Sequence, residues 1–191
     1  MRVSLSKRRH LPVLKPDNCD CSFPFWKFSK IWSLERSGLE YNSNSAHIWV
    51  MESFEDYLPP FSLRDKVILD IGACCGETAY FFLKHSARKV VCVEYDPECI
   101  RMLSYNKKNL NLNIEIIPER FSLKHLEVFH DFIKCDIEGD EVDLLPVAES
   151  LKPCVLEVHS VDLTHLFENK GFHVISRSSG HNFIMTNYMG K

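Results

Sequence analysis

Val67-Ile-Leu-Asp-Ile-Gly-Ala-Cys-Cys-Gly-Glu-Thr78, which reads VILDIGACCGET, is the most informative stretch of the chain. Its first five residues form a short, mainly apolar run that ends at Gly72, a pattern typical of a buried strand followed by a turn. Residues 77–84 then have helical spacing, with Ala79 and Phe82 on one side. The stretch therefore predicts a strand, a glycine-bearing loop and a helix in succession.

The alternation of strand and helix continues along the chain. Further short apolar runs predict strands, and several segments between them have the residue spacing of helices. Asp96 is expected to cap one of these helices. The expected strands cover residues 67–71, 90–93, 114–117, 132–136, 154–158, 172–176 and 182–186. The expected helices cover 77–84, 96–110, 141–151 with an interruption at Pro146, and 161–170.

This order of elements predicts an α/β fold. Strands that alternate with helices at this spacing form a parallel sheet covered by helices on both faces. Only a turn separates the last two strands, which predicts that the last strand is antiparallel. Ligands bind such sheets beyond the carboxyl ends of the strands, near the switch point between the first and the fourth.

Composition predicts a globular protein of the cytoplasm. With 23 basic and 26 acidic residues the net charge is −3, which argues against a dedicated nucleic-acid-binding protein. We find no signal peptide and no apolar run long enough to cross a membrane, so the eight cysteines are expected to be thiols in a reducing compartment. Cys19-Asp-Cys21 lacks the spacing of a structural zinc site, and we predict no metal.

The loop after the first strand is the predicted cofactor site. Gly72 allows a sharp turn and the close approach of a ligand, and a side chain at Gly76 would be expected to collide with the bound molecule. Glu94 ends the second strand, where a carboxylate accepts hydrogen bonds from both hydroxyls of a ribose. Together these positions predict a cofactor that contains a ribose.

The same loop is not a dinucleotide fingerprint. Counted from Gly72, the pattern GxGxxG requires glycine where Cys74 and Glu77 stand, and the charge of Glu77 would repel a pyrophosphate. S-adenosyl-L-methionine (SAM) has a ribose and a zwitterionic tail but no phosphate, so it fits the loop better. Asp70 would then face its ammonium group directly or through water.

Three segments resemble motifs of a known family. Residues 67–78 (VILDIGACCGET) and 93–97 (VEYDP) resemble the first and second motifs of class I SAM-dependent methyltransferases. Residues 134–141 (KCDIEGDE) are similar to the K-x-D-x-E-G-x-E motif of the FkbM-like methyltransferases, and LEVH at 156–159 and FENKGF at 167–172 follow in the same order. The resemblance covers about residues 64–187, and Cys74-Cys75 departs mildly from the usual first motif.

The resemblance implies a Rossmann-like class I methyltransferase with a seven-stranded sheet and SAM as the methyl donor. It places Gly72, Ala73 and Gly76 against the methionine part of SAM and Asp136 close to the sulfonium. It also implies O-methylation of a small-molecule or sugar-like acceptor. The residues expected at the cofactor are Asp70, Gly72, Ala73, Gly76, Glu94, Tyr95 and Asp136.

An alcohol acceptor needs a base, which we expect among Asp136, Glu138, Glu141 and His159. We assign the catalytic role to Glu138 and His159, because histidine has an ordinary pKa near 6.5 and the glycine after Glu138 leaves room for a substrate. In the alternative interpretation the carboxylates bind loop amides and His159 is structural. A third interpretation makes Asp136, Glu138 and His159 the ligands of a divalent metal ion.

Residues 1–64 form an N-terminal extension with few periodic apolar segments, and residues 65–191 form the predicted SAM-binding domain. The extension as a whole is interpreted as a lid or a substrate-side segment, and it includes a helix expected at 47–57. It also includes an aromatic cluster that we interpret as core packing, as a lid over the acceptor pocket or as a surface for a partner. The cluster comprises Phe23, Phe25, Trp26, Phe28 and Trp32.

Two other functions stay open at the level of sequence. Residues 106–113 resemble a segment of some tRNA-modifying methyltransferases, so an RNA methyltransferase is one alternative, although the acidic net charge does not favour it. A non-catalytic SAM-binding module is the other, because no single residue stands out as the base.

Overall fold

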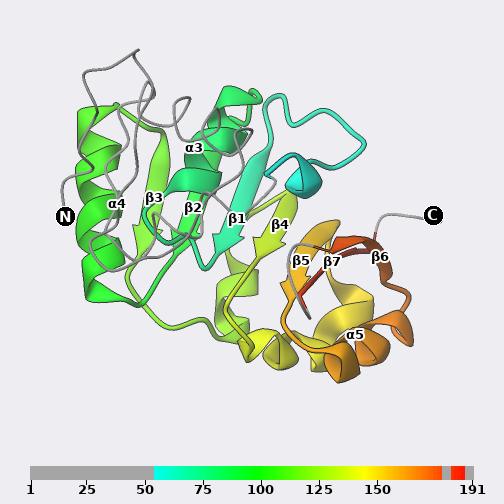
Figure 1. Ribbon diagram of the computed structural model, residues 1–191. Helices are drawn as coiled ribbons and strands as arrows, with labels where there is room; N and C mark the ends of the chain where they lie inside the picture. The colour runs from blue at the N-terminus through cyan, green and yellow to red at the C-terminus, as the bar shows by residue number, and fades with distance from the viewer. Residues whose placement is uncertain (1–53, 178–181, 188–191) are drawn as a thin grey trace, which may run out of the picture.

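The computed structural model describes residues 54–177 and 182–187. Its core is the sheet predicted from the sequence, with seven strands in the order β3-β2-β1-β4-β5-β7-β6 (Figure 1). The strands are β1 (Val67–Ile71), β2 (Lys89–Val93), β3 (Ile114–Ile117), β4 (Phe132–Cys135), β5 (Cys154–Val158), β6 (His173–Arg177) and β7 (Phe183–Thr186).

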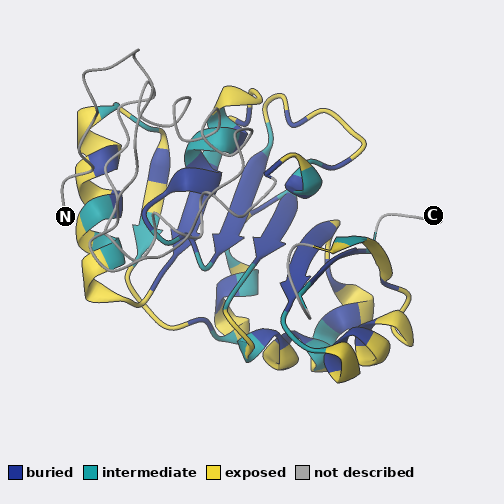
Figure 2. Ribbon diagram, in the orientation of Figure 1, coloured by how far each residue is buried: buried dark blue, intermediate teal, exposed yellow. Residues whose placement is uncertain are grey.

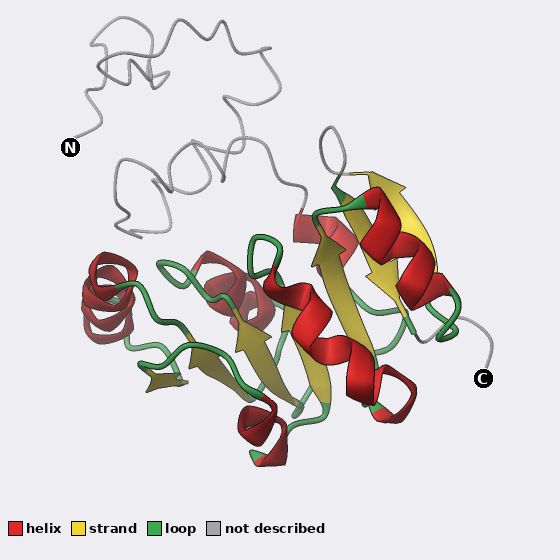
Figure 3. Ribbon diagram, turned by 90° about the horizontal axis from the view of Figure 1, so that it is seen from below, coloured by secondary structure: helices red, strands yellow, loops and turns green. Residues whose placement is uncertain are grey.

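Three α-helices and three 3-10 helices precede or connect the strands in the described part of the chain. The α-helices are α3 (Glu77–Lys84), α4 (Pro97–Asn109) and α5 (Val161–Glu168), and the 3-10 helices are η1 (Phe54–Tyr57), η2 (Leu123–Glu127) and η3 (Asp140–Ser150). Helical segments lie on both sides of the sheet (Figure 3). The predicted α/β fold class is confirmed.

The sheet packs against its helices through two hydrophobic cores. Side chains alternate along a strand, so Leu69 and Ile71 of β1 join the core that includes Phe167 of α5. Ile68 points the other way, into the core that includes Phe82 of α3. All five residues of β1 are buried, as expected for a central strand covered on both faces (Figure 2).

The first five strands are parallel, and β7 is antiparallel to both of its neighbours. The prediction of an antiparallel last strand is therefore confirmed. The structure adds that β7 lies between β5 and β6, so β6 is the edge strand, and its residues are mostly exposed. Helix α5 carries the chain past the position that β7 then fills.

The segment predicted as a helix at 141–151 has a different type of helix in the structure. The segment is the 3-10 helix η3, and Pro146 lies inside it. Proline has no amide hydrogen to donate and its ring crowds the preceding turn, which disfavours a regular α-helix at this position. The other boundaries agree with the predictions to within two residues.

The N-terminal extension falls mostly outside the described residues. The aromatic cluster at 23–32 and residues 47–53 of the expected helix lie there, while η1 forms the end of that segment as a 3-10 helix. Phe54, Tyr57 and Leu63 are buried and belong to the core on the α3 side. This stretch before residue 64 thus packs with the sheet, and the division into a lid and a SAM-binding domain remains a prediction.

Candidate active site

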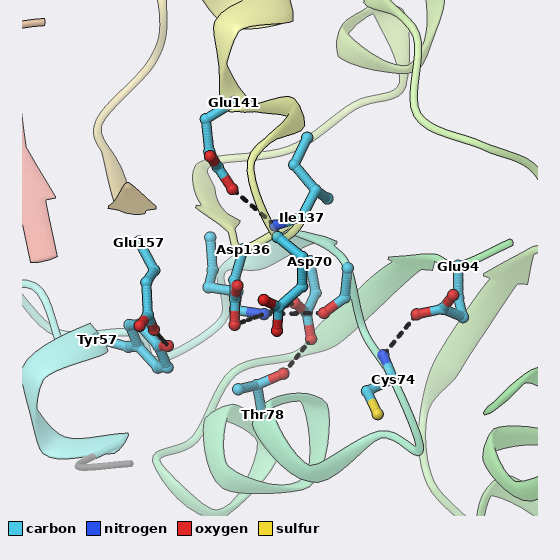
Figure 4. A network of polar contacts seen from close by, with 12 residues as sticks. Tyr57, Asp70, Cys74, Thr78, Glu94, Asp136, Ile137, Glu141 and Glu157 are labelled. Atoms are coloured by element: carbon cyan, nitrogen blue, oxygen red, sulfur yellow. Dashed lines mark hydrogen bonds and ion pairs between the residues drawn. The ribbon is translucent and has the colours of Figure 1, made fainter. Parts of the chain in front are cut away.

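The predicted site residues gather at the carboxyl ends of β1, β2 and β4. Strand β1 pairs with β2 on one side and β4 on the other, so the loops that follow these strands diverge at the switch point. Figure 4 shows Asp70, Glu94 and Asp136 at this edge of the sheet. The residues that the sequence pattern selected therefore share one edge of the sheet.

Gly72 is required by a close backbone approach. Its φ is +76°, and a Cβ there would stand 1.8 Å from the carbonyl oxygen of Asp136. Any side chain would therefore separate the cofactor loop from the end of β4. The amide of Gly72 donates to the carbonyl of Val93, which ties the loop to β2 as well.

Gly76 packs tightly against a side chain of α4. Its φ is +95°, and a Cβ there would stand 2.6 Å from Cδ1 of Leu103 in α4. The described neighbour of this glycine is thus a core side chain rather than an open ligand site. Ala73, the other small residue of the loop, is also buried. Both residues remain predictions as cofactor contacts.

Glu94 fixes the cofactor loop from the end of β2. One carboxylate oxygen, Oε2, accepts the amide of Cys74 at 2.8 Å. The other, Oε1, accepts the amides of Tyr95 and Asp96 at 2.7 and 2.8 Å. Each carboxylate oxygen has about two acceptor sites, so the group retains capacity for a ribose hydroxyl.

Tyr95 follows Glu94 and projects outward. The residue is 64% exposed, and the guanidinium of Arg120 lies 6.0 Å from the centre of its ring. An exposed ring beside the Glu94 carboxylate is available to cover a flat ligand group. The side chain of Arg120 also forms an ion pair with Asp140 at 2.5 Å.

Asp70 is fully buried and faces inward. Its Oδ2 accepts the hydroxyl of Thr78 at 2.6 Å (Figure 4). Its Oδ1 lies 3.3 Å from Nζ of Lys134. Burial raises the pKa of this carboxyl, against the opposing effects of Lys134 and Thr78. In this arrangement Asp70 holds the base of the loop, and its predicted contact with the ammonium group of SAM stays a prediction.

Lys134 was not predicted as a site residue, although it joins the parts of the site. Its Nζ donates to the carbonyl of Gly72 at 2.9 Å and lies 3.9 Å from Oδ2 of Asp136. The side chain is 2% exposed and its ammonium lies 5.6 Å from the ring centre of Tyr57. A lysine inside the apolar run FIKC was the available signal, because buried lysine is rare unless paired.

Asp136 follows β4, and its carboxyl is largely buried. Oδ1 has no hydrogen-bond partner within the described part of the chain. Burial raises the pKa of Asp136 to about 7, although Lys134 and His159 act in the opposite direction. The group therefore changes charge near neutral pH.

His159 is surrounded by three carboxylates. Its Nδ1 lies 3.0 Å from Oε1 of Glu141, and its Nε2 lies 3.7 Å from Asp136 and 3.5 Å from Glu138. Burial opposes the charge of the ring, but these three carboxylates raise the pKa of His159 to about 9. The structure thus brings the two predicted catalytic residues together.

Glu141 and Glu138 have different settings around that histidine. Glu141 is fully buried, and its Oε1 also accepts the amides of Ile137 and Gly139. Although burial opposes ionisation, His159 and these amides lower the pKa of Glu141. The side chain of Glu138 is 71% exposed on a backbone with φ +55°, and Gly139 beside it faces open space. Glu141 therefore positions the ring, while Glu138 can reach a substrate.

Two further buried acids were also missed. Glu157 of β5 accepts the hydroxyl of Tyr57 at 2.6 Å, a contact that no local pattern indicates. Glu77 is 4% exposed at the start of α3, and its Oε1 has no hydrogen-bond partner among the described residues. Burial raises the pKa of Glu77 to about 8, against the opposing effects of nearby backbone amides and Lys134. The sequence indicated its charge but not its burial.

The basic group after β3 is paired with acids. Lys124 and His125 both contact Glu119, at 2.6 and 3.3 Å, and Arg120 pairs with Asp140. Asn106, at the start of the segment that resembles tRNA-modifying enzymes, is buried and donates to the carbonyl of Cys75 at 2.9 Å. These residues thus have structural partners in the described chain.

Two clusters have the composition of metal sites. Asp136, Glu138 and His159 form the one anticipated from the sequence, and Cys74, Cys75 and Cys99 form one that was not anticipated. In each cluster the three donor atoms lie within 4.8 Å of one another. The first set suits hard or borderline ions and the second suits soft ones.

Known structures share the fold. Fibrillarin from Aeropyrum pernix, solved with natively bound SAM, matches with a TM-score of 0.51 and 14% identity over 68% of this chain and 70% of that one. Precorrin-6y C5,15-methyltransferase from Geobacter metallireducens matches with a TM-score of 0.50 and 18% identity over 64% of this chain and 80% of that one. The sequence matches no family model and no curated protein.

The likeness shows a class I methyltransferase fold, which confirms that part of the resemblance. At these identities it shows the fold alone. Among the described residues, no helix is both long and apolar enough to cross a membrane.

Proposed function

We propose that the protein is a SAM-dependent methyltransferase that methylates an oxygen of a small-molecule or sugar-like acceptor. The observation that carries the proposal is the convergence of Gly72, Glu94 and Asp136 at the switch point of a class I methyltransferase sheet. The shared fold with fibrillarin, whose structure holds SAM, supports this choice of cofactor.

In the proposed complex Glu94 binds the ribose and Tyr95 covers the adenine. Glu94 is already oriented by three backbone amides, so little reorganisation is needed to accept a ribose hydroxyl. The methionine part lies along Gly72, Ala73 and Gly76. Asp70 supports this loop through Lys134, which donates to the carbonyl of Gly72.

The residues around His159 supply the acid–base chemistry in this proposal. The acceptor oxygen attacks the methyl carbon in line with the sulfonium, so a carbon–oxygen bond forms as the carbon–sulfur bond breaks. The acceptor proton passes to Glu138 or His159. Since the pKa of His159 is about 9, the ring is mostly protonated at neutral pH and must first lose that proton to act as the base.

The acceptor class rests on the FkbM-like motif at 134–141 and on the space beside it. Glu138 is exposed next to Gly139, and a Cβ on that glycine would meet no other atom within 4 Å, so a substrate can approach the carboxylate. A cytoplasmic location is part of the proposal, and the six described cysteines, which are thiols, support a reducing compartment.

Calorimetry with SAM and S-adenosylhomocysteine tests the cofactor. We expect Glu94→Ala to weaken binding by about 1–3 kcal/mol, roughly 5- to 150-fold, because it removes the ribose acceptor. Glu115→Ala is the matched control, since Glu115 is an exposed acid on the neighbouring strand β3. Equal binding by folded Glu94→Ala and wild-type protein, checked by circular dichroism, would contradict the proposal.

Transfer of a labelled methyl group tests the acceptor. We expect incorporation into hydroxyl-bearing glycans or small phenols and none into bulk tRNA. Methylation of tRNA, together with salt-dependent binding, would instead identify an RNA methyltransferase. Tight SAM binding without turnover on either class of acceptor would favour a non-catalytic module.

A further inference from the structure

Three thiols from two elements meet beside the cofactor loop. Cys74 and Cys75 belong to the loop between β1 and α3, and Cys99 lies in the first turn of α4. The Sγ of Cys74 lies 3.6 Å from that of Cys99 and 4.0 Å from that of Cys75. Cys75 is buried, whereas Cys74 and Cys99 are partly exposed, so solvent reaches one side of the cluster.

The sulfur separations suit a shared metal ion. Sulfurs bound to one tetrahedral zinc at about 2.3 Å stand about 3.8 Å apart. The separations of 3.6 and 4.0 Å fall on either side of that value, and all three sulfurs lie within 4.8 Å of one another. An ion at the centre of the cluster therefore requires only small movements of the side chains.

Hydrogen bonds to residues outside the cluster hold the backbone of Cys74 and of Cys99. Cys74 has φ +46°, which is uncommon for a residue other than glycine, and its amide donates to Glu94. The amide of Cys99 donates to Oδ1 of Asp96, the residue that caps α4. The ligand positions are thus organised before an ion arrives, which lowers the cost of binding.

We propose that Cys74, Cys75 and Cys99 bind one thiophilic divalent metal ion, such as Zn²⁺, with a solvent molecule as the fourth ligand. Thiolates favour zinc and softer metals over Mg²⁺ or Ca²⁺. The ion joins the cofactor loop to α4 and holds Cys74, whose amide orients Glu94. Binding at this site needs no cofactor, so it stands apart from the proposed methyltransferase activity.

Cd²⁺ is the probe, because its bonds to thiolates absorb in the ultraviolet. The full-length protein, reduced with a phosphine, is titrated with Cd²⁺ in the absence of SAM. We expect a charge-transfer band that saturates at one equivalent. Loss of one of three thiolates in Cys74→Ser or Cys99→Ser should weaken Cd²⁺ binding at least about tenfold. Zn²⁺ that competes for the site should displace Cd²⁺ and remove the band.

The double variant Cys19→Ser/Cys21→Ser is the control, because these two thiols are not among the three proposed ligands, and we expect it to keep the band. A band that persists unchanged in folded Cys74→Ser/Cys99→Ser, or that disappears in the control, would overturn the proposal. Alkylation of the wild-type protein gives a test without variants. Zn²⁺ should protect Cys74 and Cys99 from the reagent, and equal labelling with and without Zn²⁺ would show that the thiols only pack together.

Discussion

The pKa of His159 depends on the charges of three neighbouring carboxylates. Its ring is protonated at neutral pH because Glu141, Asp136 and Glu138 outweigh the effect of burial. The charged ring contributes to stability below its ordinary pKa of 6.5, and the contribution is lost as the pH rises through about 9. The residue is thus both a candidate base and an electrostatic partner of the site.

The titration of His159 can be measured directly by NMR of the labelled imidazole. We expect a midpoint near 9 in the wild-type protein and a lower midpoint in Glu141→Gln, which removes the negative charge 3.0 Å from Nδ1. Glu168→Gln is the matched control, because Glu168 pairs with the exposed His165. An unchanged His159 midpoint in Glu141→Gln would show that Glu141 does not hold the ring in its charged form.

Glu77 provides a second pH test, of stability. Its pKa is raised to about 8, so the folded state favours the neutral carboxyl. That contribution is complete below the ordinary pKa of 4.5 and is lost as the pH rises through about 8. We therefore expect Glu77→Gln to unfold with similar free energy at pH 4 and to be more stable than wild type at pH 9, by roughly 2–4 kcal/mol.

Denaturant unfolding at both pH values measures this difference. The exposed Glu98→Gln serves as the control, and we expect it to leave the free energy of unfolding nearly unchanged because Glu98 is 60% exposed. If Glu77→Gln lost stability at pH 9, the buried carboxylate would be making favourable contacts and its pKa would not be raised.

Among the elements, helix α4 depends most visibly on its first turn. Asp96 accepts the amides of Glu98 and Cys99, and Pro97 occupies the first helical position. We expect Asp96→Ala to lower the free energy of unfolding by about 1 kcal/mol, and Asp96→Ser to restore much of that loss, because serine can accept the same hydrogen bond. Thermal unfolding of the two variants gives the comparison, and equal losses would show that capping is not the cause.

The strands were the elements best predicted from sequence, because a central parallel strand is apolar on both faces. Val67–Ile71 and Cys154–Val158 have the predicted bounds for this reason. The segment from Asp140 to Ser150 was less predictable. Its residues indicated a helix with an interruption at Pro146, whereas the segment is a 3-10 helix that continues through Pro146.

Across the molecule as a whole, the candidate site was predictable where it follows from one loop and one strand end. Gly72 and Glu94 belong to that class. Lys134 and the contact between Tyr57 and Glu157 do not, because they join residues far apart in the chain. The cluster of thiols was missed for the same reason, since Cys99 meets Cys74 only once α4 has packed against the loop.

The position of β7 bears on how the chain is completed during translation. Strand β7 follows β6 in synthesis but separates it from β5 in the sheet. Until residues 183–186 leave the ribosome, β5 has one open edge and β6 has no described strand beside it. A nascent chain stalled before this point presents unpaired strand edges, with which strands of other chains can pair. The part of the sheet formed by β5, β7 and β6 therefore cannot form strand by strand in the order of synthesis, and its folding requires β7.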